Sequence, residues 1–286
     1  MKDGSDMEAR RQIEESGAAV RRPGRLKAYA RFMGAAFAVN LKSTLEYRVN
    51  FILQFFGMML NNAAFAAFWA VLIGRTGEVG GYGFSDVMLV WALVSTSFGL
   101  AHVVFGNVRQ IGRIVMEGSL DVYLLQPKDV WLNLLASKTI VSAWGDLAYG
   151  YIVLALTVGA DLQRFVLFTA LIIPGAAIFA ATFAAVESLA FFMGNSSAVS
   201  SALTEFMLSF SLYPEGVYGK SMRWILYTVV PSGFVAFMPL RAFKALDWRL
   251  VPVLWLVAAV YVAASYRLFN AGLRRYESGN RMDSRV

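Results

Sequence analysis

Long apolar runs separated by short polar segments dominate the chain. A helix needs about 20 mostly apolar residues to cross the hydrocarbon core of a bilayer, and five runs are close to that length or longer. They extend over residues 51–73, 87–105, 139–159, 165–192 and 250–269. This pattern predicts an all-α, polytopic membrane protein.

The region before the last apolar run allows two interpretations of one further span. Residues 198–213 are moderately apolar but contain Glu205 and several hydroxyl side chains. Residues 224–240 are more apolar but contain Pro231 and Pro239, and proline interrupts the hydrogen bonds of a helix. We expect the first segment to cross the membrane, and a crossing by the second is the alternative.

The distribution of basic residues favours six spans with both termini in the cytoplasm. Cytoplasmic segments of membrane proteins carry an excess of Lys and Arg. With residues 198–213 as the fifth span, 19 of the 26 basic residues lie on the cytoplasmic side. Making both disputed segments into spans would place the basic C-terminal tail outside. We therefore predict six transmembrane helices, with residues 214–249 as a re-entrant hairpin on the outer side.

Composition agrees with a membrane protein and excludes several kinds of chemistry. Of the 286 residues, 58% are apolar and 16% are charged, whereas soluble domains average about 25% charged residues. The net charge is +7. Most of the basic residues lie in the predicted cytoplasmic segments, where they set the topology, so no nucleic-acid partner is expected. The chain has no cysteine and His102 is its only histidine, so we expect neither catalytic residues nor a metal site.

The segments outside the spans suggest how the chain is divided. Residues 1–24 are charged and lack an apolar core, which predicts a disordered cytoplasmic N-terminus rather than a signal peptide. Apolar residues recur every three or four positions over residues 26–48, which predicts an amphipathic helix at the membrane interface. Residues 25–275 would form one transmembrane domain, and residues 276–286 a cytoplasmic tail.

Residues 106–131 belong to the predicted cytoplasmic connection between the second and third spans. Four charged residues recur there every fourth position and would form one stripe on a helix, with the second and third spaced to pair. Gly118 can end such a helix, and Pro127 favours an extended conformation just before it. The apolar residues 122–125 then favour a protein-binding surface over a solvated loop. The four charged residues are Arg109, Arg113, Glu117 and Asp121.

A few ionisable and amide side chains are predicted at membrane depth, where such groups are costly and often functional. A carboxylate costs more to bury than an amide, so the acidic residues of the third and fourth spans are the stronger candidates. They could line a translocation path or a proton relay, or they could form hydrogen bonds between helices. The candidates for the translocation path are Asn61, Asn62, Asp146 and Glu187.

The sequence contains no complete nucleotide-binding motif. Residues 219–221 read Gly-Lys-Ser, like the end of a phosphate-binding loop, but Pro214 stands where that motif needs a glycine. The chain is therefore not expected to hydrolyse ATP by itself.

Together, the six predicted spans, the interfacial helix and the proline-rich outer hairpin resemble a type-2 ABC exporter permease. Residues 117–127, with the sequence EGSLDVYLLQP, are similar to the Gly-x-Leu-Asp-x-x-Leu-Leu-x-Pro pattern of a bacterial subfamily of these permeases. The pair Tyr213-Pro214, followed by Pro231 and Pro239, resembles the final third of the same subfamily.

This resemblance implies one half of a transmembrane dimer, formed with an identical or a homologous permease in the bacterial inner membrane. A separate ATPase subunit would carry ATP and Mg²⁺ and bind the cytoplasmic connection as a coupling helix. The transported compound would be amphipathic, lipid-like or a drug, and surrounding lipid would be a further partner. The ATPase-coupling residues implied are Arg109, Arg113, Glu117, Asp121, Tyr123 and Gln126.

Two other classes of function compete with this interpretation. An ion- or proton-coupled secondary transporter would use Asp146 and Glu187 as its intramembrane carboxylates. A membrane-bound lipid-modifying enzyme is the third class, and no catalytic motif in the sequence supports it.

Overall fold

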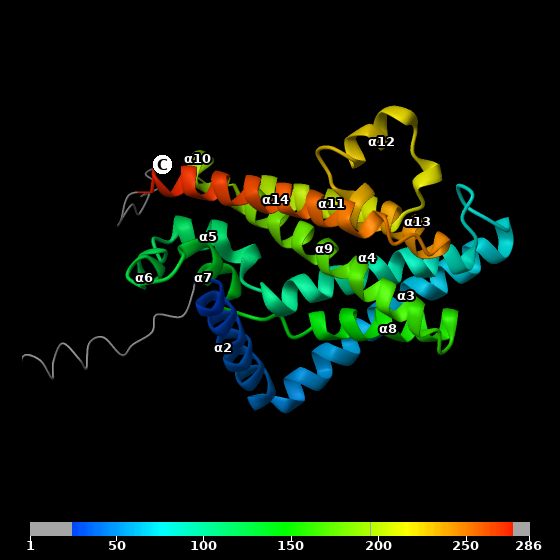
Figure 1. Ribbon diagram of the computed structural model, residues 1–286, viewed down its shortest axis with the longest axis horizontal. Helices are drawn as coiled ribbons and strands as arrows, with labels where there is room; N and C mark the ends of the chain where they lie inside the picture. The colour runs from blue at the N-terminus through cyan, green and yellow to red at the C-terminus, as the bar shows by residue number, and fades with distance from the viewer. Residues whose placement is uncertain (1–24, 195, 277–286) are drawn as a thin grey trace, which may run out of the picture. The chain divides into compact units, whose positions relative to one another are not determined.

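A computed structural model describes residues 25–194 and 196–276, and these residues are almost entirely helical (Figure 1). Helix accounts for 80% of the structure. The described residues contain no strand, only one isolated bridge between Val79 and Tyr82. The predicted all-α class is therefore confirmed. The predicted disordered N-terminus over residues 1–24 lies outside the described residues, as does the predicted tail after Tyr276.

The chain forms two units, residues 1–39 and residues 40–286. The described part of the first unit belongs to helix α2 (Arg25–Glu46). This helix covers most of residues 26–48, where an amphipathic helix was predicted. Its position at the membrane interface stays a prediction. All other helices, and the last turns of α2 from Asn40 onward, belong to the second unit.

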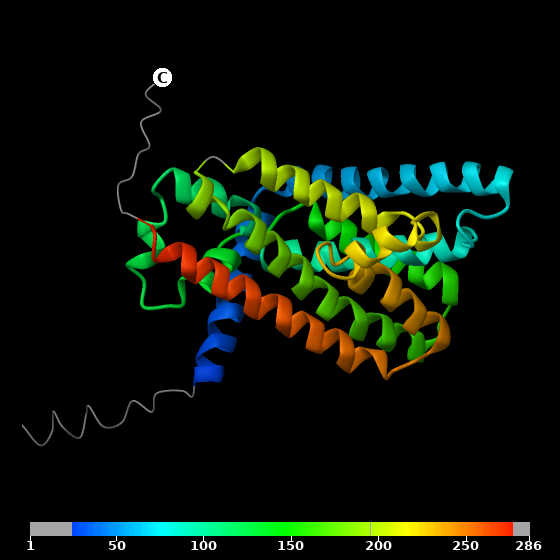
Figure 2. The same cartoon turned by 90° about the horizontal axis from the view of Figure 1, so that it is seen from above.

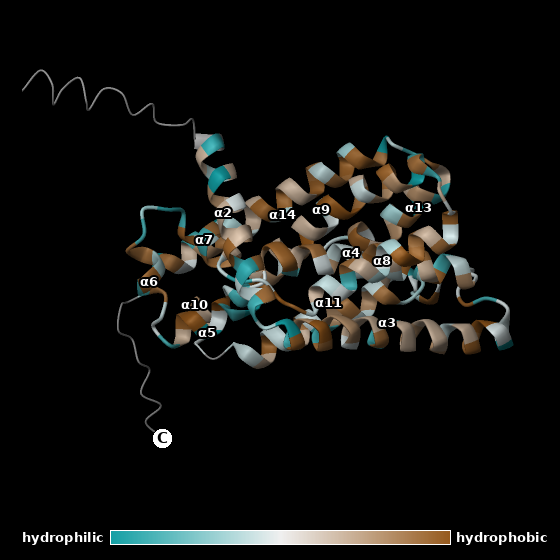
Figure 3. Ribbon diagram, turned by 90° about the horizontal axis from the view of Figure 1, so that it is seen from below, coloured by the Kyte–Doolittle hydropathy of each residue, from teal (hydrophilic) through white to brown (hydrophobic). Residues whose placement is uncertain are grey.

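Four helices of the described chain are long and apolar enough to cross a membrane. They coincide with four of the five predicted apolar runs, and Figure 3 shows hydrophobic residues along their length, with hydrophilic ones gathered near the short helices at the ends. Each of these helices contains an apolar run long enough to be recognised as a membrane span from the amino-acid sequence alone. The four are α3 (Arg48–Thr76), α4 (Phe84–Val104), α9 (Leu162–Glu187), which continues into α10 (Ala190–Met193), and α14 (Leu250–Leu273).

The third predicted span is shorter than its apolar run. Helix α8 (Ala143–Val158) has 16 residues and starts four positions later than the run over residues 139–159. The preceding segment is held against the end of α4: the Ile140 amide donates to the His102 carbonyl at 3.1 Å, and the Gly106 amide donates to the Lys138 carbonyl at 3.0 Å. These contacts replace the hydrogen bonds that an earlier helix start would make.

The disputed region also differs between its two halves. Helix α11 (Ser197–Leu212) is one continuous helix of 16 residues. Residues 224–240 do not form the single helix that a crossing there would need, because the chain turns before Pro231 and a new helix begins beside Pro239. The alternative crossing is therefore not supported, while the complete six-span layout stays a prediction. The pieces of the hairpin are η2 (Glu215–Val217), α12 (Lys220–Leu226), the π-helical turn η3 (Gly233–Phe237) and α13 (Met238–Ala245).

Helix α4 forms the centre of the second unit. It is buried along most of its length and packs against α8 and α9, while α3 packs on α8 and α14 on α9 (Figure 2). Glycines allow the closest of these approaches. A Cβ atom on Gly150 of α8 would overlap the Thr96 hydroxyl and lie 2.8 Å from the Ala92 carbonyl oxygen of α4. The pair α4 and α8 is therefore in backbone contact.

Candidate functional site

Three buried polar side chains from three helices form a hydrogen-bonded group, which we call the polar triad: Asn62, Trp91 and Asp146. The Asn62 amide donates to Asp146 Oδ1 at 2.7 Å and accepts from the Trp91 indole N–H at 2.8 Å. All three residues are at most 5% exposed. The amide of Asn62 thus connects α3, α4 and α8 inside the apolar bundle.

The polar triad includes two of the four predicted translocation-path residues and separates them from the others. Asn61, the next residue on α3, is exposed, and its amide lies 3.8 Å from the Met58 sulfur. Glu187 lies at the far end of α9. Trp91 was missed from the sequence, although a buried indole N–H generally requires a hydrogen-bond partner. Their role in a translocation path stays a prediction.

The predicted coupling segment consists of short helices rather than one. Helix α5 ends where Gly118 adopts a left-handed conformation with φ of 71°. The Gly118 amide donates to the Val115 carbonyl and the Ser119 amide donates to the Ile114 carbonyl, at 3.3 and 3.0 Å. These two bonds define a Schellman motif, which favours glycine at that position. The elements are η1 (Val108–Gln110), α5 (Ile111–Met116), α6 (Asp121–Leu124) and α7 (Val130–Ala136).

The prediction of one charged stripe on one helix is therefore wrong. Arg109 lies in η1, Arg113 in α5, Glu117 at the C-cap of α5, and Asp121 begins α6 beyond the turn. The first three side chains are exposed. Arg113 and Glu117 form no ion pair among the described residues. The four charges remain at one end of the second unit, and their role in coupling stays a prediction.

Helix α6 and its C-cap residue expose three apolar side chains, which we call the apolar tip: Val122, Leu124 and Leu125. Their exposed fractions are 63%, 41% and 87%. Between them, Tyr123 points inward, with its hydroxyl 3.2 Å from the Ser137 hydroxyl. The apolar run noted in the sequence is thus a surface feature.

The two remaining predicted coupling residues hold this segment in place. The Tyr123 hydroxyl also lies 3.5 Å from the amide nitrogen of Asn107, which follows α4. Gln126 accepts a hydrogen bond from the Asn133 amide of α7 at 2.9 Å. Their polar groups are therefore used within the chain and fix the position of the apolar tip.

Glu187 connects a membrane helix to the coupling segment. Its Oε2 accepts the backbone N–H of Gly112 in α5 at 3.1 Å, and the positive charge of Arg109 lies near enough to act on it. A Cβ atom on Gly112 would stand 2.7 Å from the same oxygen. The sequence placed Glu187 at membrane depth, and the structure places it at the end of α9 with a partner in α5.

Glu187→Ala is expected to loosen α5. Removing the acceptor leaves the Gly112 N–H without its charge-assisted hydrogen bond, so amide exchange in α5 should accelerate about tenfold. Hydrogen–deuterium exchange of a peptide covering residues 108–118 measures this. Glu205→Ala is the matched control, because Glu205 is an exposed carboxylate on α11. Equal protection of α5 in both variants would show that Glu187 does not hold this helix.

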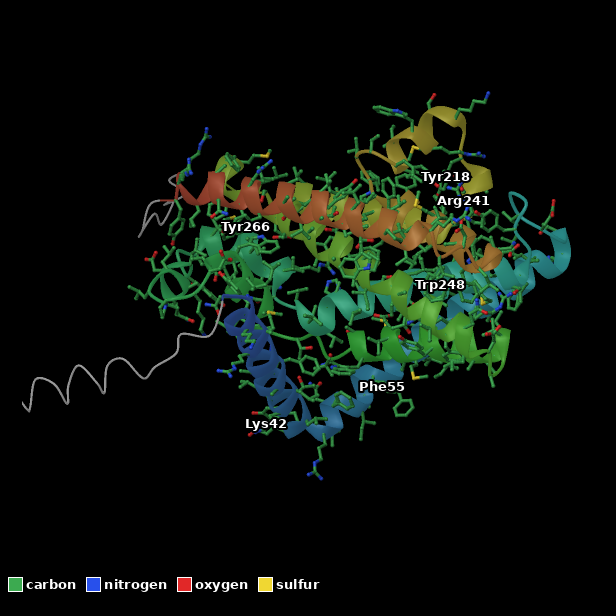
Figure 4. The ribbon with its side chains drawn as sticks, viewed as in Figure 1. Lys42, Phe55, Tyr218, Arg241, Trp248 and Tyr266 are labelled. Carbon is green, nitrogen blue, oxygen red and sulfur yellow. The ribbon has the colours of Figure 1, made fainter. Side chains whose placement is uncertain are left out.

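The opposite end of the second unit carries a second charged group. Arg241 of α13, labelled in Figure 4, forms an ion pair with Glu215 at 3.8 Å and donates to the Tyr227 hydroxyl. Burial, with the nearby charge of Glu215, raises the pKa of Tyr227 to about 12, so its hydroxyl stays protonated and donates to Glu215 at 3.3 Å. Lys244 pairs with Asp86 of α4 at 2.6 Å. These contacts fasten the predicted re-entrant hairpin to itself and to α4.

Among the described residues, no group of three or more His, Cys, Asp or Glu side chains is placed to hold a metal ion. Membrane-length apolar helices, a buried polar triad and a polar end with an exposed apolar tip are features of an integral membrane protein. A family described as ABC-2 family transporter protein matches residues 59–280. The chain belongs to this family of membrane transport components, which confirms the resemblance to an ABC-2 type permease. No curated protein and no solved structure matched the chain.

Proposed function

We propose that the chain is the permease subunit of an ATP-driven exporter and that a separate ATPase subunit, with its ATP and Mg²⁺, supplies the energy. Membership of the ABC-2 transporter family supports the permease role. The observation that carries the ATPase partner is the apolar tip. Its three large side chains are exposed together on a short helix at a polar end of the second unit. Clustered exposed apolar residues mark a surface that binds another protein or a membrane. Because this cluster lies at a polar end, outside the long apolar helices, we assign it to a protein partner.

The hydrogen bonds behind the apolar tip give it a mechanical connection to the membrane helices. Asn107, fully buried just after α4, donates to the Leu134 carbonyl at 3.1 Å and to the Ser137 hydroxyl at 2.8 Å. These bonds join the end of α4 to α7, and Tyr123 joins α6 to the same group. A force applied to the tip would therefore reach α4, the central helix of the bundle.

A second connection leads to the last membrane helix. Tyr266 of α14 donates to the Asp129 carboxylate, at the N-cap of α7, at 2.9 Å. Tyr276 follows α14, and burial together with the nearby Asp121 carboxylate raises the pKa of Tyr276 to about 12, so its hydroxyl stays protonated. With Glu187 on α9, three membrane helices are thus tied to the coupling segment.

Helix α11 would be the fifth of six spans, with both termini cytoplasmic in a bacterial inner membrane. Three of its hydroxyl residues support this, because Ser200, Thr204 and Ser211 are buried in the bundle. Ser211 donates to the Ser232 hydroxyl of the hairpin at 3.0 Å. Such interhelical bonds satisfy polar groups within a membrane.

A second permease, identical or homologous, would complete the pathway as a dimer. Helix α3 exposes a long apolar face that includes Leu53, Phe56 and Leu60, each at least 60% exposed. Asn61 lies among them, and an exposed amide is better accommodated at a protein interface than in lipid. The exported compound would be amphipathic, lipid-like or a drug, and the surrounding lipid would contact the remaining face.

An ion-coupled carrier would need its carboxylates along one path. Asp146 is engaged in the polar triad, and Glu187 is engaged with α5 at the end of α9. The two acids thus belong to separate groups of contacts. We therefore assign the energy source to the partner ATPase.

Leu125→Glu tests the proposal. Leu125 is the most exposed residue of the apolar tip, and burying a new carboxylate in an apolar interface is unfavourable. We expect at least about tenfold weaker binding of the ATPase subunit, which is the loss typical of a moderate interface residue. Affinity purification of the co-expressed subunits, followed by titration, measures it.

The matched control is Ser119→Glu, which adds the same charge at an exposed position outside the apolar tip. It is expected to leave ATPase binding within about twofold of the original, as interface-rim charges usually do. Binding that is unchanged in Leu125→Glu would remove the apolar tip as the docking surface. Loss in both variants would show that only the charge of this segment matters.

A further inference from the structure

A polar cavity of about 340 Å³ opens beside the start of α3. Its walls are the last turns of α2 from Asn40 onward, the first residues of α3 and the extended segment that precedes α8. Hydroxyl and amide side chains make up most of the lining, with Lys138 as its cation and no acidic residue. The volume equals that of about ten waters in the liquid, which leaves room for a phosphate and an attached polar group.

The walls of the cavity are held by hydrogen bonds and are therefore preformed. The Asn40 amide donates to the Ala136 carbonyl at 2.9 Å, which ties the end of α2 to α7. The opposite wall is bound to the end of α4 through the carbonyls of Lys138 and His102. The Thr139 hydroxyl in this wall is buried and has no hydrogen-bond partner among the described residues. A ligand with additional acceptors would suit such a site.

Under the proposed topology, the cavity would lie at the depth of the lipid headgroups. The chain bends at Tyr47 between α2 and α3, and the apolar span begins directly afterwards. Tyr47 lines the cavity and is 68% exposed, and tyrosine is enriched at membrane–water interfaces. Asn50, in the first turn of α3, lines it at the same level. A group bound here would contact the start of α3 and the segment between α7 and α8.

We propose that this cavity binds the phosphate group of a molecule with a net negative charge at the membrane surface. Lys138 supplies the positive charge, and the hydroxyls of Ser43 and Thr44 and the amide of Asn50 supply neutral donors. Phosphate oxygens are strong acceptors for donors of these types. The bound phosphate bridges the end of α2 and the segment that leads into α8. This inference does not depend on the ATPase partner, since it concerns the chain and the bilayer alone.

The test uses the full-length chain in nanodiscs of phosphatidylcholine containing increasing amounts of phosphatidylglycerol. Native mass spectrometry then counts the phosphatidylglycerol molecules that the protein retains. Lys138→Gln is expected to weaken lipid retention about tenfold, because it removes one charge-assisted hydrogen bond. Ser43→Ala combined with Thr44→Val keeps every charge and is expected to weaken retention several-fold, since it removes two hydroxyl donors.

Lys42→Gln is the matched control. Lys42 (labelled in Figure 4) is an exposed lysine on α2 beside Ser43. It does not line the cavity. General attraction between basic residues and anionic lipid would make Lys42→Gln as harmful as Lys138→Gln, and that result would overturn the site. Unchanged retention in Lys138→Gln and in the double hydroxyl variant would overturn it too.

A competition arm distinguishes the two sources of the phosphate. Inorganic phosphate at millimolar concentration, added to the same nanodiscs, displaces the retained lipid if the cavity recognises free phosphate. Retention that resists inorganic phosphate but falls in Lys138→Gln assigns the site to the headgroup. Both results support a phosphate site, and they differ only in which molecule carries the phosphate.

Discussion

Replacing Asn62 by leucine is expected to lower the free energy of unfolding by about 2–4 kcal/mol. The amide makes one hydrogen bond to a carboxylate and one to an indole, and both partners are buried. Leucine leaves the Asp146 carboxylate and the Trp91 N–H unpaired inside the bundle, where each is costly. Thermal and denaturant unfolding of the detergent-solubilised protein, followed by the near-ultraviolet circular dichroism of its tryptophans, measures the loss.

Asn61→Leu is the control for this prediction. The two asparagines are adjacent on α3, yet Asn61 is exposed and makes no interhelical hydrogen bond among the described residues. We expect its replacement to leave the unfolding temperature unchanged or slightly raised. Equal losses in the two variants would contradict the importance of the polar triad.

The double variant Asn62→Leu with Asp146→Leu separates structure from function in the polar triad. Removing both partners of a buried hydrogen bond is less damaging than removing one, so part of the lost stability should return. Transport by this more stable double variant then tests the predicted role of Asp146 in the translocation path. Retained transport would make the triad purely structural, and lost transport in a stable variant would give Asp146 a functional role.

Gly150→Ala is expected to destabilise the bundle by about 3 kcal/mol, the upper end of overpacking effects. The new methyl group would overlap the Thr96 hydroxyl, and the Ala92 carbonyl on the other side is backbone that cannot rotate away. Helices α4 and α8 would have to separate along their contact. Unfolding temperature and the retention of the monodisperse species in detergent report this change.

Gly57→Ala provides the comparison for the same substitution. Gly57 lies on α3 and a Cβ there meets nothing within 4 Å. Alanine is favoured over glycine within a helix by up to about 1 kcal/mol, so stability should be unchanged or raised. A loss at Gly57 as large as that at Gly150 would mean that the close contact between α4 and α8 is not what Gly150 provides.

Much of the bundle could be predicted from the sequence because a bilayer selects long apolar runs. Four of the predicted spans agree with helices of membrane length. The start of α8 could not be predicted, since Ile140 and Val141 are as apolar as the helix that follows. Their exclusion from the helix depends on hydrogen bonds to residues near the end of α4, more than 30 positions earlier. Apolar pattern alone contains no such information.

The part of the candidate site that could be predicted from the sequence is the pair of acidic residues in apolar runs. The burial cost of an intramembrane carboxylate singled out Asp146 and Glu187, and both have specific partners in the structure. The partner of Asp146 is Asn62, which was itself a candidate. Gly112, the partner of Glu187, and Trp91, which donates to Asn62, are distant in sequence and were not found. The charged stripe failed for a local reason: Gly118 ends α5, so a four-residue repeat that continues past it to Asp121 no longer describes one helix face.

The short helices α8 and α11 have a consequence for the bilayer itself. Each has 16 residues and is therefore about 24 Å long, against a hydrocarbon thickness of about 30 Å. Under the proposed topology, these two helices leave a hydrophobic mismatch that the lipids relieve by drawing the two leaflets closer together. An amphipathic compound moving beside α8 and α11 would then cross a narrower hydrocarbon layer than anywhere else around the protein.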